Sequence, residues 1–190
     1  MRIHPQCCSC ATTFAACSEP TSCMSRYCAG MVVKCTKRMD FSPELVWKSG
    51  QSAAFMSKLD KNVKDVAIQK FSDECDIVYW RINLPPGITN RDFCVMRLLR
   101  ARPEVHSYET LLISAVHPNF PEKKGTTRAF LFAYSNVQAA PGAPLDAHGV
   151  PSAATNMSLG FTDVRGSIPP KLMEKMMCVA PARGRAHLSQ

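Results

Sequence analysis

The sequence predicts an α+β fold in which a curved antiparallel sheet is covered by one long C-terminal helix. Runs rich in β-branched and aromatic residues follow one another between residues 63 and 164 with short loops between them, as in sheets whose strands pair antiparallel. A helix start precedes these runs near Ser42, and an amphipathic segment follows them after Ser167. Such a sheet must bury its apolar face, and one long amphipathic helix laid across it does so. Incomplete cover would leave a pocket for an apolar ligand.

Residues 1–30 differ in kind from the rest of the chain. The chain has 190 residues and 10 cysteines, and most of the cysteines lie in its first 35 residues. These are Cys7, Cys8, Cys10, Cys17, Cys23, Cys28 and Cys35. One interpretation is a loop or disordered extension that carries free thiols. The other is a metal site formed by Cys7, Cys10, Cys23 and Cys28. The spacing of Cys7, Cys10, Cys17 and Cys23 copies the first part of a binuclear zinc cluster, but the next gap, from Cys23 to Cys28, is too long for that pattern. We favour free thiols, with no metal and no cofactor.

The first regular elements are a short strand and a helical region. Residues 31–39 alternate enough to predict a strand. Ser42 then supplies an N-cap, with Pro43 at the first helical position and Glu44 in the first turn. The helical pattern continues to about residue 59 and is interrupted near Gly50.

Strand patterns dominate the middle of the chain, and a helical pattern ends it. The expected strands cover residues 63–71, 75–84, 91–100, 108–116, 126–137 and 155–164. The intervening loops are marked by proline and glycine at 85–90, 117–125 and 139–152. After Ser167, which can act as a cap, apolar residues recur at helical spacing on one face. These are Leu172, Met173, Met176 and Met177.

Composition and motifs exclude several classes of function. The net charge of +8 comes from 23 basic and 15 acidic residues without a dense basic run, so we expect no nucleic-acid partner but weak attraction to an anionic bilayer. The longest apolar run, residues 129–134, is too short to span a membrane, and the first residues lack a secretory signal. We therefore expect a cytoplasmic protein that is peripheral to membranes.

No sequence feature indicates catalysis. The motifs GxGxxG, GxxxxGK, HExxH and GxSxG do not occur, and none of the 5 histidines lies within four residues of another. We therefore expect that the protein is not an enzyme and has no catalytic residues.

From residue 41 onward the chain resembles the START (steroidogenic acute regulatory-related lipid transfer) family, and within it the phosphatidylcholine transfer protein-like members. Four segments carry the resemblance in the family's order and spacing. They are SKLDKNVKDVAI, DIVYWRINLPPGITNRDFCVMR, HPNFPEKKGTTRA and DVRGSIPPKLMEKM. The second and fourth segments are the most specific.

The resemblance implies a helix-grip fold, in which a curved antiparallel sheet wraps around a long C-terminal helix and encloses a cavity for one lipid. It assigns residues 31–182 to a START-like domain, after the extension at 1–30 and before a basic tail at 183–190. The implied function is to bind one lipid or sterol and to transfer it between membranes. An alternative is a regulatory or interaction module that does not transfer lipid. In the family, the C-terminal helix and a nearby loop, here 167–178 and 85–90, move to admit the ligand.

The resemblance also implies candidate site residues. Trp80, Phe93 and Phe132 match aromatic positions around a choline group, although all three could be ordinary core residues. Arg97 shares a strand face with Phe93, so it is either a buried cation that orients the polar end of a lipid or a solvated surface residue. Three methionines suit a surface that repacks around an apolar guest, or ordinary helix–sheet core. They are Met173, Met176 and Met177.

The chain departs from the family pattern at three places. The family's Trp-Asp is Leu59-Asp60 here, and its phosphate-binding arginine falls at Met56, which removes the strongest reason to name a phospholipid. The family also has a helix and two strands before the strand expected at residues 31–39. Either the domain lacks these N-terminal elements, or the cysteine-rich residues replace part of a missing sheet edge.

Overall fold

A computed structural model describes residues 21–24, 31–166 and 168 of the chain. Several predictions fall on residues outside these ranges. The predicted C-terminal helix, with Met173, Met176 and Met177, lies outside the described residues, and so do the basic tail and most of the cysteine-rich extension.

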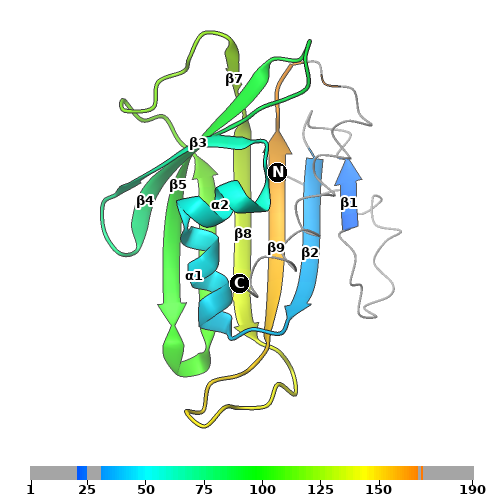
Figure 1. Ribbon diagram of the computed structural model, residues 1–190, viewed down its shortest axis with the longest axis vertical. Helices are drawn as coiled ribbons and strands as arrows, with labels where there is room; N and C mark the ends of the chain where they lie inside the picture. Colours follow the sequence, from blue (N-terminus) through cyan, green and yellow to red (C-terminus); the bar gives the residue numbers. More distant parts are fainter. Residues whose placement is uncertain (1–20, 25–30, 167, 169–190) are drawn as a thin grey trace, which may run out of the picture.

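The described chain forms one large, almost entirely antiparallel sheet (Figure 1). Its spatial order is β1-β2-β9-β8-β6-β5-β4-β3, with β7 pairing separately to β5. The strands are β1 (Thr21–Met24), β2 (Met31–Met39), β3 (Val63–Lys70), β4 (Cys75–Ile82), β5 (Asn90–Arg102), β6 (Ser107–Ser114), β7 (Thr126–Arg128), β8 (Phe130–Ala139) and β9 (Ala154–Asp163). A 3-10 turn, η2 (Pro103–Val105), joins β5 to β6. The α+β prediction and its antiparallel sheet are confirmed.

Two short helices lie across one face of this sheet (Figure 1). They are α1 (Pro43–Gln51) and α2 (Ala53–Leu59). The helical region was predicted to break near Gly50, but the break is at Ser52. The extended backbone of Ser52 ends α1, and its hydroxyl accepts a hydrogen bond from the backbone N–H of Phe55 to cap α2.

The face under these helices, which we call the inner face, is identified by side-chain contacts. Val46 of α1 packs against Tyr108, Val137 and Ala154. The indole Nε1 of Trp47 donates to the hydroxyl of Thr110 at 3.0 Å. Because side chains alternate along a strand, the cross-strand pairings then assign each strand residue to the inner face or to the opposite, outer face.

Two strands differ from the predictions. Thr21–Met24, within the segment expected to be loop or disordered, forms β1 and pairs with the Met31–Lys34 part of β2. This favours the alternative in which cysteine-rich residues replace part of a sheet edge. Residues 126–137 were predicted as one strand, but they divide at Ala129, since β7 pairs in parallel with β5 while β8 pairs with β6 and β9.

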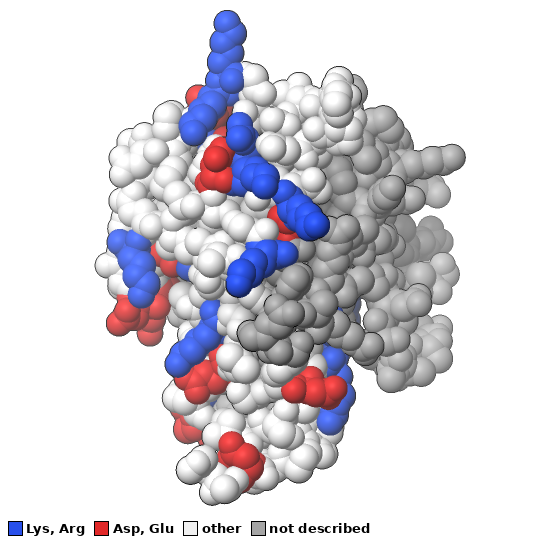
Figure 2. Space-filling model, viewed as in Figure 1, with Lys and Arg blue, Asp and Glu red and all other residues white. Residues whose placement is uncertain are grey.

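Charged residues of both signs are interspersed over the face that carries α1 and α2 (Figure 2). In the described residues, no helix is both long and apolar enough to cross a membrane.

Candidate functional site

The inner face of β4 and β5 places a buried ion pair next to a run of apolar side chains. Cross-strand pairing aligns Asp76 with Arg97, then Val78 with Val95, then Trp80 with Phe93. All six of these side chains are buried. The arrangement follows from two strands whose residues at every second position face the helices.

The sequence alone did not decide whether Arg97 is buried or solvated, and the structure places it among the buried residues. It is only 5% exposed, and Asp76 is 1% exposed. The guanidinium binds the carboxylate in a fork, with Nε donating to Oδ1 at 2.9 Å and Nη2 donating to Oδ2. Its Nη1 donates to the backbone carbonyl of Gln51, at the end of α1, at 3.3 Å.

The guanidinium retains hydrogen-bonding capacity beyond these three bonds. An arginine side chain has five N–H donors, and the three bonds to Asp76 and Gln51 use three of them. The two further donors are one N–H on Nη1 and one on Nη2. They can bind an oxygen atom of a ligand without breaking the pair with Asp76.

The apolar part of the face is built around Trp80 and Phe93. Their rings are stacked, with centroids 4.8 Å apart and planes 10° from parallel. They belong to a core cluster with Val63, Val78, Val95 and Ala129, against which Met56 of α2 packs. The position of the family's phosphate-binding arginine is therefore part of an apolar contact in this chain.

The structure does not bring Phe132 together with this stack. Phe132 pairs across the strands with Ile113, and Ile113 pairs with Met96. Met96 follows Val95 in β5 and therefore points to the other face. Phe132 accordingly lies on the outer face, where it is 40% exposed.

The inner face is lined by small side chains on β8 and β9. Ala133 lies opposite Gly160, and Ser135 lies opposite Ser158. None of these four residues is fully buried. This part of the inner face therefore contributes little side-chain volume of its own.

Arg91 joins the loop before β5 to the segment after β9. Its guanidinium is buried and donates to the backbone carbonyls of Thr89, Val164 and Arg165. Burial lowers the pKa of Arg91. Arg91 therefore fastens the loop before β5 to the end of β9, a link that the sequence did not show.

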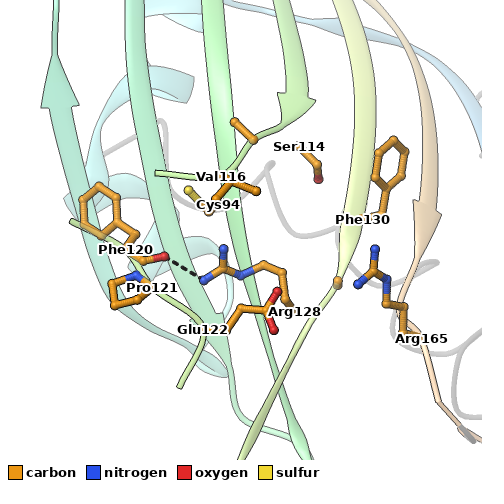
Figure 3. Close-up of a pocket in the computed structure, with 11 residues that line it drawn as sticks. Cys94, Ser114, Val116, Phe120, Pro121, Glu122, Arg128, Phe130 and Arg165 are labelled. Atoms are coloured by element: carbon orange, nitrogen blue, oxygen red, sulfur yellow. Dashed lines mark hydrogen bonds between the residues drawn. The ribbon is translucent and has the colours of Figure 1, made fainter. Parts of the chain in front are cut away.

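On the outer face, Asp92 is held by β7. It accepts two hydrogen bonds from Arg128, from Nε at 2.9 Å and from Nη2 at 3.1 Å. Burial alone would lower the pKa of Arg128, but its hydrogen bonds and charge interaction with Asp92 raise it. The same Arg128 donates to the carbonyl of Phe120 in the loop after β6 (Figure 3).

A pocket of about 220 Å³ lies beside this cluster on the outer face (Figure 3). Cys94, Phe120 and Phe130 form part of its wall, and Arg165 and Glu122 contribute charged side chains. Burial raises the pKa of Cys94, whose side chain is fully buried. This pocket was not predicted, because its wall combines residues of four strands, β5, β6, β7 and β8, with a loop.

Comparison with known proteins identifies the fold. No protein-family model matches the sequence, and no curated protein matches it. Solved structures do match. The chain is similar to human StAR-related lipid transfer protein 5, with a TM-score of 0.70 and 21% identity over 90% of this chain and 82% of that one.

Two further solved structures are similar. One is a STAR-related lipid transfer protein from Xanthomonas axonopodis, with a TM-score of 0.66 and 18% identity over 90% of this chain and 93% of that one. The other is the lipid transfer and protein localization domain of human StarD13, with a TM-score of 0.65 and 14% identity over 88% of each chain. The resemblance read from the sequence is confirmed at the level of the fold.

Proposed function

We propose that this chain, which has the fold of START domains, binds one lipid or sterol against the inner face of its sheet and transfers it between membranes. Neither the binding nor the transfer of the lipid involves covalent chemistry. The single observation that carries the proposal is the buried Asp76–Arg97 pair, which presents unused N–H donors beside an apolar run of side chains. The fold shared with lipid transfer domains supports it.

An inner face of this composition can stabilise a lipid outside the bilayer. Transfer of each CH2 group from water to an apolar environment contributes about 0.8 kcal/mol, so a lipid leaves a membrane only for an equally dry surface. Val78, Val95 and the stacked rings of Trp80 and Phe93 form an apolar core of this kind next to Arg97. The side chains at the paired positions of Ala133, Gly160, Ser135 and Ser158 on the same face are small.

The charge of the ion pair favours a ligand with a neutral polar end. Arg97 and Asp76 together carry no net charge, so a hydroxyl group that accepts from Arg97 adds no buried charge. A phosphate there would leave a net negative charge in a poorly solvated site. Met56 and Phe132 also provide neither a phosphate ligand nor a choline cage. A sterol or another hydroxyl-bearing lipid fits these residues best.

We further propose that the protein is cytoplasmic and contacts membranes transiently. Ligand entry requires the loop at residues 83–89 to separate from the end of β9. Arg91 joins these segments through its hydrogen bonds to three backbone carbonyls, so these bonds must break or shift when a lipid enters or leaves.

A vesicle assay tests the proposal. Purified chain is mixed with donor vesicles that contain labelled cholesterol, and in parallel with vesicles that contain labelled phosphatidylcholine. Extraction of cholesterol into the protein fraction and delivery to acceptor vesicles is expected. The variant Arg97→Met should extract at least tenfold less, whereas Phe132→Ala, on the other face, should extract as the wild type does.

The outcomes separate the alternatives. Binding without delivery would favour a non-transferring regulatory module. If neither lipid is bound or moved above the level of an unrelated control protein, the proposal is wrong.

A further inference from the structure

The outer face of the sheet carries two adjacent rows of apolar side chains. Cross-strand pairing aligns Ile113, Phe132 and Phe161 in one row, and Leu111, Tyr134 and Leu159 in the next. We call these six side chains the outer apolar rows. Phe132 is 40% exposed and Leu159 is 43% exposed, and the other four are partly exposed.

The two rows continue onto the next strand. Met96 extends the first row on β5, and Leu98 extends the second. Among the residues that the structure describes, a third layer covers the outer face only at one end, where Phe120 of the loop after β6 stacks on Tyr79 with ring centroids 5.3 Å apart. In the described part of the chain, α1 and α2 both lie on the inner face. An apolar sheet face is ordinarily covered by a packed helix or by a second sheet.

The dimensions of the rows fit one helix. Neighbouring strands are about 4.8 Å apart, so the rows extend about 14 Å from β9 to β5, which is the length of roughly ten helical residues. Same-face residues along a strand are about 6.8 Å apart, so two rows match the width of a helix about 10 Å across.

The polar residues beside the rows favour an acidic partner. Next to Tyr134, Glu109 accepts from its hydroxyl and is also paired with both Arg100 and Arg102, which leaves an excess of positive charge. At the opposite border, the exposed Arg165 lines the pocket shown in Figure 3 together with Glu122, so charges of both signs lie there. The pocket meets the rows at Phe130, whose ring centroid lies 5.9 Å from that of Phe161.

We propose that the outer apolar rows dock an amphipathic helix of about three turns from a partner protein, with acidic residues flanking the apolar face of that helix. Anchors at i, i+3, i+4 and i+7 would lie over the two rows. Carboxylates on one side of them would reach Arg100 and Arg102. The surface is on the opposite side of the sheet from Asp76 and Arg97, so the partner and a ligand on the inner face can be held at the same time.

The test uses the full chain and two labelled synthetic helices. Both probes are 16-residue amphipathic peptides with leucine at the anchor positions, and they carry either glutamate or lysine at the remaining positions. Fluorescence anisotropy should show that the acidic peptide binds at least tenfold more tightly than the basic one. Leu159→Glu should weaken binding of the acidic peptide at least tenfold. Leu159→Ser should weaken binding several-fold, while the secondary structure of the variant chain stays unchanged. Gln138→Glu, an equal charge change outside the rows, should have little effect.

Four results would overturn the proposal. These are no binding of the acidic peptide, binding that Leu159→Glu leaves unchanged, a dimer in sedimentation that Leu159→Glu dissociates, and binding to vesicles of 70% phosphatidylcholine and 30% phosphatidylserine that Leu159→Glu abolishes. The last two would assign the face to a second copy of the chain or to a membrane. Lipid extraction by Leu159→Glu should match the wild type, which separates this surface from the lipid site.

Discussion

Removing one member of the Asp76–Arg97 pair should destabilise the fold far more than removing both. In Arg97→Met, the carboxylate of Asp76 remains at 1% exposure without its fork of hydrogen bonds. Loss of one partner from a buried ion pair costs about 3–5 kcal/mol. Small domains are stable by only about 5–15 kcal/mol, so this single change should remove a large share of the stability.

The double variant Asp76→Val with Arg97→Met should recover most of that loss. It leaves no uncompensated charge and places two apolar side chains next to Val78 and Val95, and such replacements are often neutral or stabilising. Urea unfolding followed by circular dichroism gives the free energies of all three proteins. Arg81→Met is the matched control, because its ion pair with Asp65 is partly exposed and should contribute less than about 1 kcal/mol.

The same variants separate stability from ligand binding. If the pair orients the polar end of a lipid, the double variant should fold well and still extract cholesterol poorly. Two results would refute the reasoning. One is a loss of less than about 1 kcal/mol in Arg97→Met, which would mean that the pair is not buried in solution. The other is wild-type extraction by the stable double variant.

Three further changes have defined outcomes. Trp80→Ala should cost about 3–5 kcal/mol of unfolding free energy, whereas Phe132→Ala should cost under about 1.5, and equal losses in urea unfolding would contradict the assignment of the two rings to different faces. Arg91→Met leaves three carbonyls without their donor, so it should lower the unfolding free energy by about 1–3 kcal/mol. It should also speed lipid release from the protein, and an unchanged release rate would argue that Arg91 does not hold the loop at residues 83–89 to the end of β9 during exchange. Burial raises the pKa of Cys94, so unfolding free energy should fall as pH rises above the ordinary thiol value of 9.0, and Cys94→Ala should flatten this decline in thermal melts between pH 8 and roughly pH 10.

The sign of the pH effect follows from the direction of the shift. Above its ordinary pKa the thiol ionises in the unfolded chain, while the buried thiol of Cys94 keeps its proton. The folded state then binds more protons than the unfolded state, so stability falls with rising pH until the folded thiol also ionises. The slope from one such group is at most about 1.4 kcal/mol per pH unit.

The sequence was sufficient for elements whose signal is local. Alternation, proline and glycine placed β3, β4, β5, β6 and β9 within a few residues of their true ends. It also placed Phe93, Val95 and Arg97 on one strand face, because spacing along a single strand determines that. Which face it was, and that Asp76 would be the partner of Arg97, depended on the register between β4 and β5.

Two of the differences from the predictions arose where long-range pairing decides the structure, and one arose from a local helix cap. Phe132 lies three strands from Trp80 in the sheet, and a shift of one residue in any intervening register changes its face. The division of residues 126–137 at Ala129 depends on β7 finding β5 rather than on any local signal. The helix break moved from Gly50 to Ser52, since a hydroxyl that caps the next helix outweighed the flexibility of glycine.

Native mass spectrometry of the purified chain can show whether the inner face holds one lipid. We expect one molecule of a hydroxyl-bearing lipid per chain after incubation with mixed vesicles, and its absence from the Asp76→Val, Arg97→Met double variant. A folded wild-type chain that carries no lipid under these conditions, or a double variant that carries the same lipid at the same occupancy, would contradict it.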